Sequence, residues 1–333
     1  MLRYDEIANV IDWFLQAFAA VQGWIFETAV QPLIFHLGLM AYVEDAHDAV
    51  ETVMIGVIEI GVLCALLKPL EAWRPVEQWQ DRTNVRADVI YTWLHRLGVL
   101  PLLIFLLLVI PFIELEGWLR MNGIVRPNIE DLIPGIERNG LAAFLVFVII
   151  IDFAEYWMHR LQHRFNWWWA LHSLHHSQRQ MSFWTDDRNH LLDDIFTSTG
   201  VAIVALAIGV PSNQFILIMI ATRMIESFSH VNARVHFGWL GNRLLVSPAF
   251  HRMHHAIGAG HEGKYQGVNF ATLFPLWDIV FRTADFTPAY QPTGIRDQLE
   301  GRDYGIGFWR QQWLGLVRLK NSMVFVGREP SRL

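Results

Sequence analysis

Histidines are concentrated in three short stretches of this chain, at the spacing of metal ligands on a helix. HRLQH places His159 and His163 four residues apart. HSLHH and HRMHH each place three histidines at positions i, i+3 and i+4, namely His172, His175, His176, His251, His254 and His255. Residues three or four apart share one helix face, and neutral imidazole is the commonest metal ligand. Eight imidazoles are too many for one ion and suit two, so the sequence predicts a two-metal site.

Two further histidines and two carboxylates are candidates for the same site. His190 and His230 follow polar residues near the ends of apolar stretches, and we expect each to be a further ligand or a close neighbour of the ligands. Asp152 and Glu155 precede His159 by seven and four residues, so the three side chains share one helix face. A carboxylate there can accept the second ring N–H of a ligating histidine and fix its tautomer. We therefore predict that Asp152 and Glu155 support the catalytic site.

The ligand types restrict the metal without selecting one. Imidazole suits iron, zinc, copper and nickel. Cys64 is the only cysteine and lies in an apolar run, so a thiolate cage is excluded. Iron would allow activation of dioxygen, whereas zinc would allow only Lewis-acid or hydroxide chemistry. No stretch of the sequence resembles a haem, flavin or nicotinamide site, so an oxidation would need electrons from a separate donor.

Apolar helices have to position these side chains. Hydrophobic residues make up 53% of the 333 residues and charged residues 17%, below the ~25% charged residues of typical soluble domains. Stretches of membrane-spanning length cover residues 12–40 (with a break expected at Pro32), 50–70, 93–115 and 139–158. Residues 195–225 are interrupted at GVPSN, and each half is too short to span, which predicts a hairpin. The predicted fold is an all-α integral membrane protein with about four spanning helices, a short helical hairpin and a cytoplasmic histidine-rich helical cap.

Basic residues predict the orientation. Residues 68–96 and 159–194 are rich in arginine, whereas YVEDAHD, between the first spans, is acidic. The positive-inside rule then places every histidine-rich stretch in the cytoplasm of a multi-pass protein. The net charge of −6, without a basic stripe, excludes nucleic acid as a partner.

Three regions follow from this pattern. We divide the chain into N-terminal membrane helices (1–138), a histidine-rich core (139–286) and a C-terminal tail (287–333). Within the tail, residues 307–323 alternate tryptophan and leucine with basic residues, as an amphipathic helix does. Such a helix would lie either in the membrane interface or on the protein's own surface.

These motifs resemble those of the fatty acid hydroxylase and sterol desaturase superfamily of membrane di-metal enzymes. The resemblance covers about residues 140–285, through DFAEYWMHRLQH, LHSLHHS, SHVN, SPAFHRMHH and GVNFATLFPLWDIVFRT. It implies the eight clustered histidines as ligands, with His230 as a further candidate, of a non-haem centre that is normally di-iron and uses dioxygen and two electrons. Ala271 and Arg282 stand where the family usually has glycine.

The predicted function is a membrane-bound oxygenase that hydroxylates or desaturates a C–H bond of a membrane lipid, with electrons from an external donor. Two alternatives use the same histidines. A non-catalytic metal-binding or metal-transporting membrane protein would place its ligands near the middle of several spans. A zinc-dependent lipid hydrolase would act without dioxygen.

Overall fold

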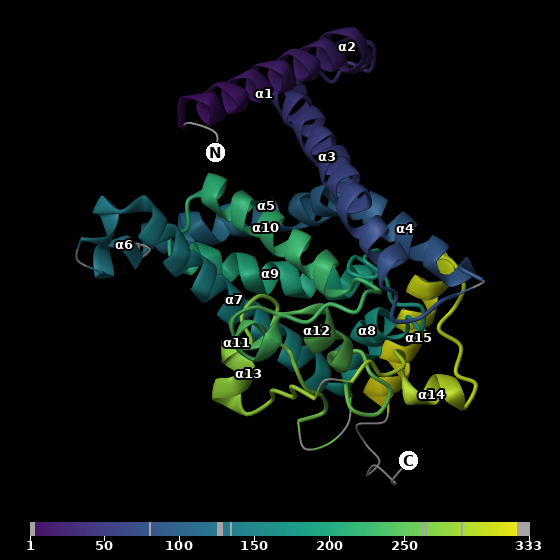
Figure 1. The fold of residues 1–333 in the computed structure, drawn as a ribbon. Coiled ribbons are helices and arrows are strands. Elements are labelled where there is room, and N and C mark those ends of the chain that lie inside the picture. The colour runs from purple at the N-terminus through teal and green to yellow at the C-terminus, as the bar shows by residue number, and fades with distance from the viewer. Residues whose placement is uncertain are drawn as a thin grey trace. The chain divides into compact units, whose positions relative to one another are not determined.

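The fold was analysed in a computed structural model, which describes residues 4–79, 81–124, 129–133, 135–261, 263, 265–287 and 289–324. Within these ranges the regular structure is entirely helical, with two isolated β-bridges and no strand (Figure 1). This confirms the all-α prediction for the described part of the chain. The chain forms two compact units, Met1–Val62 with Trp93–Val99, and Leu63–Thr92 with Leu100–Leu333. All the candidate metal ligands belong to the second unit.

The first unit contains α1 (Tyr4–Ile25), a π-helical segment (Phe26–Val30), α2 (Gln31–His36) and the first part of α3 (Val43–Trp73). The break predicted at Pro32 is wrong. Pro32 lies in the first turn of α2, next to the π-helical segment, and a proline in a first turn removes no N–H that the helix needs. The chain turns instead at Gly38, whose φ of +72° favours glycine.

Two helices are long and apolar enough to cross a membrane by length and composition. They are Met40–Trp73, which contains α3, and α7 (Gly140–Arg164). In each, only 33% of the most apolar window is buried; along α7, for example, Leu141, Leu145 and Ile149 are exposed. A core helix of a water-soluble protein would bury such residues, whereas lipid would cover them here. These helices match the spans predicted at 50–70 and 139–158.

The other predicted apolar segments are divided differently. Residues 93–115 do not form one helix, because α4 (Thr83–Arg96) ends at a turn before α5 (Val99–Met121) begins. The turn depends on Gly98, which has a φ of +77°. Residues 195–225 form α9 (Leu191–Ala207) and α10 (Ser212–Ser229), and the break falls at GVPSN as predicted. A total of about four spans remains a prediction.

In the second unit, the histidine-bearing helices pack around α7. The end of α7 contacts α8 (Asn166–His176), α9 runs alongside α7, and α10 contacts α12 (Pro248–His254) (Figure 1). An apolar core joins α7, α9 and α10 through Phe147, Ile151, Val201, Ala205 and Ile218. Each large side chain buried in it contributes about 1.5–3 kcal/mol. The shorter helices are α6 (Ile129–Leu132), α11 (Gly238–Leu244), α13 (Leu276–Phe281) and α14 (Arg296–Leu299).

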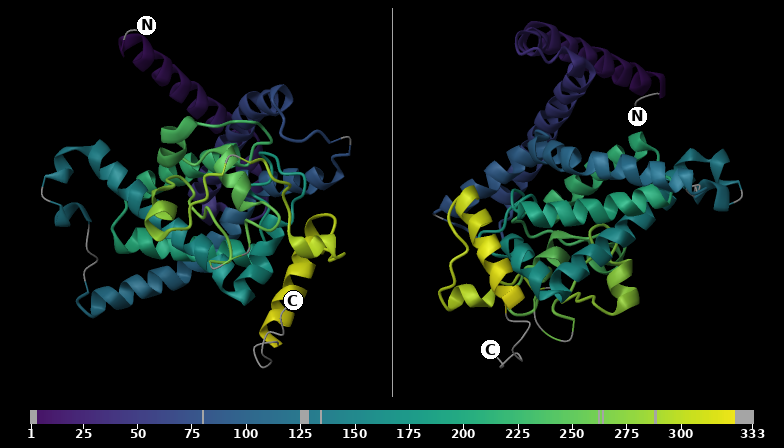
Figure 2. Two further views of the ribbon diagram at one scale, coloured as in Figure 1. Left: turned by 60° about the horizontal axis from the view of Figure 1, so that its bottom comes forward. Right: turned by 180° about the vertical axis from the view of Figure 1, so that it is seen from behind.

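The C-terminal helix α15 (Phe308–Val324) packs along α8 (Figure 2). Of the two positions expected for this segment, this is the one on the protein's own surface. The Nε of Arg318 donates to the carbonyl of Ala170, on α8, at 3.0 Å. The opposite face of α15 exposes Trp309 and Trp313. The helix that carries HSLHH is therefore covered on one side by α15.

Candidate metal centre

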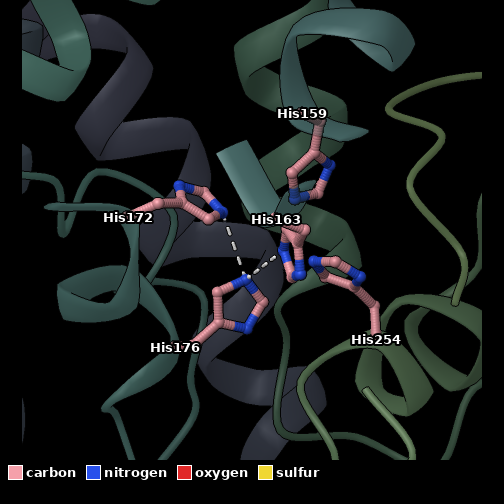
Figure 3. Close-up of side chains that lie close together, drawn as sticks. All are labelled: His159, His163, His172, His176 and His254. Atoms are coloured by element: carbon pink, nitrogen blue, oxygen red, sulfur yellow. Dashed lines mark hydrogen bonds between the residues drawn. The ribbon is translucent and has the colours of Figure 1, made fainter. Parts of the chain in front are cut away.

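Five histidines from three helices converge at one point, as Figure 3 shows. His159 and His163 come from the end of α7, His172 and His176 from α8, and His254 from α12. One ring nitrogen of each lies within 4.8 Å of a ring nitrogen of every other. The Nε2 of His176 lies 3.1 Å from that of His163 and 3.2 Å from that of His172. We call these five residues the first histidine group.

Four more histidines form the second histidine group: His175 on α8, His230 at the end of α10, and His251 and His255 at the end of α12. The Nε2 of His230 lies 3.2 Å from that of His175 and 3.0 Å from that of His251. The two groups are adjacent, because the ring centroids of His176 and His255 are 4.4 Å apart.

Because of the i, i+3, i+4 spacing, α8 and α12 each contribute histidines to both groups. On α8, His172 and His176 belong to the first group and His175 to the second. On α12 the middle histidine of the three belongs to the first group and the outer two to the second. Two neighbouring ions need ligands on either side of the same helix turn, and this spacing supplies them.

The nitrogen separations fit metal binding. Metal–imidazole bonds are about 2.0–2.1 Å long, which places neighbouring ligand nitrogens of one ion about 2.8–3.4 Å apart at octahedral or tetrahedral angles. The Nε2 pairs within the groups are 3.0–3.2 Å apart. The Nε2 of His254 is buried and has no hydrogen-bond partner. A cation would remove the repulsion between facing lone pairs and satisfy this nitrogen.

Backbone carbonyls fix the tautomers of several rings. The Nδ1 of His159 lies 2.8 Å from the carbonyl of Phe270, and that of His254 lies 2.7 Å from the carbonyl of Val268. The Nδ1 of His230 lies 2.7 Å from the carbonyl of its own helix at Glu226. A carbonyl only accepts, so each Nδ1 carries the proton and donates it. The Nε2 is left with its lone pair, as metal binding requires.

Asp193, in the first turn of α9, orients His172. Its Oδ2 accepts from the Nδ1 of His172 at 2.9 Å. Its Oδ1 accepts from Trp168 Nε1 and Gln162 Nε2, both at 2.7 Å. The carboxylate is 2% exposed, and the N-terminus of α9 favours its negative charge. Asp193 therefore does what was predicted for Asp152 and Glu155.

Asp152 has a different role from the predicted one. Its two oxygens accept from the backbone N–H of Leu273 and from Trp277 Nε1, both at 2.8 Å, and do not contact a histidine. Glu155 makes no hydrogen bond to a histidine within the described ranges, and its Oε2 is buried without a partner. Asp152 therefore anchors a loop instead of orienting a ligand ring, and Glu155 does not orient one.

Asp278 was not identified by ligand spacing, although it lies in the WDIVFRT motif. Its carboxylate accepts from the backbone N–H of Phe270 (2.9 Å) and Ala271 (2.8 Å) and from the Thr283 hydroxyl (2.6 Å). These bonds hold the loop whose carbonyls accept from His159 and His254. Arg282 ends α13 with a φ of +59°, which explains why a glycine is usual at this position.

His190 lies outside both groups, whereas His230 belongs to the second. The Nδ1 of His190 accepts from the backbone N–H of Leu192 at 3.1 Å and caps α9. Its Nε2 lies 2.9 Å from the carbonyl of Gln312 on α15, to which it donates. Neither nitrogen is left for an ion, so the structure gives His190 a structural role in place of the predicted one.

Burial keeps most of the ligand candidates neutral. It lowers the pKa of most of them well below the usual value, and charge on neighbouring imidazoles would lower it further; this holds for His175, His176, His251, His254 and His255. Burial lowers the pKa of His230 to about 4, although the hydrogen bond to the Glu226 carbonyl and the charge of Asp187 raise it. Neutral imidazole is the form that binds metal ions, so these rings need not lose a proton to do so at pH 7.

Residues 144–283 match the family described as fatty acid hydroxylase. A human alkylglycerol monooxygenase is 29% identical over 133 residues, 40% of this chain and 28% of that protein. An ornithine lipid hydroxylase of Rhizobium tropici is 28% identical over 148 residues, 44% of this chain and 43% of that protein. A putative methylsterol monooxygenase of Dictyostelium discoideum is 26% identical over 181 residues, 49% of this chain and 62% of that protein. Each match thus covers less than two thirds of the relative. No solved structure matches significantly.

Proposed function

We propose that the protein is a membrane-bound oxygenase that hydroxylates a C–H bond of a lipid, because residues 144–283 match the fatty acid hydroxylase family. The reaction would use two iron ions, dioxygen and two electrons from a separate donor. The observation that carries the proposal is the pair of adjacent histidine groups, nine residues in all, in which five pairs of Nε2 atoms are 3.0–3.2 Å apart. The similar proteins named above are hydroxylases or monooxygenases of lipids.

Each histidine group would hold one ion. Bound there, two redox-active ions would supply the activation of dioxygen that oxidation of an unactivated C–H bond needs. The protein keeps the imidazoles neutral by burial and fixes their tautomers through the carbonyls of Val268 and Phe270 and the carboxylate of Asp193. Zinc would bind the same nitrogens, but a zinc site would not use dioxygen, so the oxygen-dependent relatives favour iron.

We place the histidine groups on the cytoplasmic face of a multi-pass protein. His159 and His163 stand in the last turns of α7, one of the two helices capable of spanning. The arginine-rich stretch 159–194 follows, and basic loops remain inside. Ligands at the end of one apolar helix, and not in the middle of several, also support an enzyme over a transporter.

The test compares His176→Ala with a matched control, His36→Ala. His36 is exposed on α2 and belongs to neither group. Protein purified under reducing, anaerobic conditions should contain one iron ion per histidine group, and His36→Ala should contain the same amount. His176→Ala should lose iron while its helix content, measured by circular dichroism, is retained.

Activity is tested with isotopically heavy dioxygen. Lipids from cells that express the wild type or His36→Ala should contain a product that has gained one heavy oxygen atom, and cells with His176→Ala should not. The proposal fails if the protein holds zinc and its product forms without dioxygen. It also fails if reconstituted vesicles show metal flux and no oxidised lipid.

A further inference from the structure

Two arginines on α7 alternate with the ligand histidines but line a separate cavity. This cavity has a volume of about 200 Å³ and is lined by Trp157, Arg160, Leu161, Arg164 and Tyr265. None of the five belongs to a histidine group. We propose that the cavity binds the phosphate of an anionic membrane lipid. The inference concerns a site distinct from the metal centre, so it does not depend on the proposed oxygenase activity.

Two guanidinium groups line the cavity, and the carboxylate of Asp278 acts on one of them, Arg160, without an ion-pair contact. Across the described ranges, no carboxylate forms an ion pair with Arg160 or Arg164. Arg160 is held in place by the ring of Trp157 at 5.1 Å and the ring of Tyr265 at 5.2 Å, and it donates to the Tyr156 hydroxyl at 3.2 Å. An anion bound in the cavity would lie close to both guanidinium groups and would reduce the repulsion between them. The planar donor fork of arginine fits phosphate oxygens.

The surface that leads to the cavity is apolar. Residues 149, 153, 157, 160 and 164 follow one another at helical spacings of three or four, so they form one stripe along α7. The stripe begins with the exposed Ile149. From Ile149 to Arg160 a helix rises about 16 Å, close to the roughly 15 Å depth of one leaflet's hydrocarbon. A lipid whose acyl chain lies along the stripe would therefore place its phosphate at the arginines. Free phosphate has no acyl chain and gains nothing from the stripe.

One residue that lines the cavity is next in the chain to a residue that contacts the metal centre. Tyr265 is followed by Gln266, whose carbonyl lies 3.1 Å from the Nδ1 of His163. A lipid that packs against Tyr265 would restrict the segment that supplies this acceptor. The lipid would thereby stabilise the loop at the edge of the first histidine group.

The test is native mass spectrometry of the full-length protein in detergent, titrated with phosphatidylglycerol or phosphatidylcholine. One phosphatidylglycerol should bind in preference to phosphatidylcholine. Arg164→Gln should weaken its binding about tenfold, the effect of losing one hydrogen bond to a charged group. Arg164→Lys keeps the positive charge but loses the planar donor fork, so its affinity for phosphatidylglycerol should lie between those of the wild type and Arg164→Gln. Arg86→Gln is the control, because Arg86 is exposed on α4 and does not line the cavity.

Competition with inorganic phosphate shows whether the cavity binds the phosphate of a lipid or free phosphate. At the concentration of the lipid it should not displace phosphatidylglycerol; displacement would show a site for free phosphate and overturn the lipid assignment. Equal binding of the two lipids by the wild type would also overturn it, and this comparison needs no variant to fold. Unchanged phosphatidylglycerol binding by a folded Arg160→Gln/Arg164→Gln double variant would refute the proposal directly.

Discussion

Replacing Asp193 by asparagine tests how the metal centre is oriented. The carboxylate accepts three hydrogen bonds, one from His172 through Oδ2 and two, from Trp168 and Gln162, through Oδ1. Asparagine has the same shape, but one of its two positions is an NH₂ group, which only donates. Whichever way the amide is turned, its NH₂ group faces a donor. If it faces His172, the ring must move its proton to Nε2, the nitrogen that points into the first histidine group.

The magnitude follows from the lost contact. Asp193 is 2% exposed, so water does not replace the missing bond, and a hydrogen bond to a charged group contributes about 1.5–3 kcal/mol. Since 1.4 kcal/mol is a factor of ten in an equilibrium constant, this corresponds to about 10–100-fold in metal affinity, the usual effect of losing an outer partner of a ligating histidine. The other histidines of the group are unchanged, so folding of the helices should persist.

The assay is competition between the protein and a chelator of known affinity, with the metal content read by elemental analysis. Asp193→Asn should lose one of its two metal ions at a lower chelator concentration than the wild type does. Asp12→Asn is the control, because Asp12 is exposed on α1, far from the histidine groups along the chain. An affinity within twofold of the wild type for Asp193→Asn would show that Asp193 does not set the tautomer of His172.

Three further predictions address stability. Arg282→Gly should raise the unfolding free energy by about 1 kcal/mol, because Arg282 has a φ of +59° and the left-handed region costs other residues about 1–2 kcal/mol; a lower melting temperature than that of Arg282→Ala would contradict this. Trp277→Phe should destabilise the protein by about 1–3 kcal/mol, because it leaves a buried oxygen of Asp152 without its donor; no change in denaturant midpoint would refute the anchoring role. Metal-free protein should lose stability as the pH falls from about 6.5 towards 4, because burial lowers the pKa of His230 to about 4 and the unfolded chain then binds the proton more readily. That loss amounts to about 3 kcal/mol for this one ring, and a metal-free melting temperature that is constant over this range would contradict it.

The local features of the site were predictable from the sequence. Side chains at i, i+3 and i+4 share a helix face because an α-helix has 3.6 residues per turn, and this holds wherever the helix lies in the fold. The eight clustered histidines depend on this periodicity, whereas the spans at 50–70 and 139–158 and the break at GVPSN depend on the length of the apolar stretches and on the glycine and proline that interrupt them. The left-handed conformation of Arg282 was not predicted, and it explains the glycine that the family resemblance leads one to expect at this position.

Only the tertiary structure decided the partners of these side chains. His190 and His230 have similar sequence surroundings, yet His230 joins the second group and His190 caps α9 against α15. Asp152 shares a helix face with His159, but a loop more than a hundred residues later supplies its hydrogen-bond donors and the acceptor for His159. Periodicity determines which way a side chain points from its own helix. What it meets depends on how distant segments pack, and that is set by the shapes of their buried apolar faces.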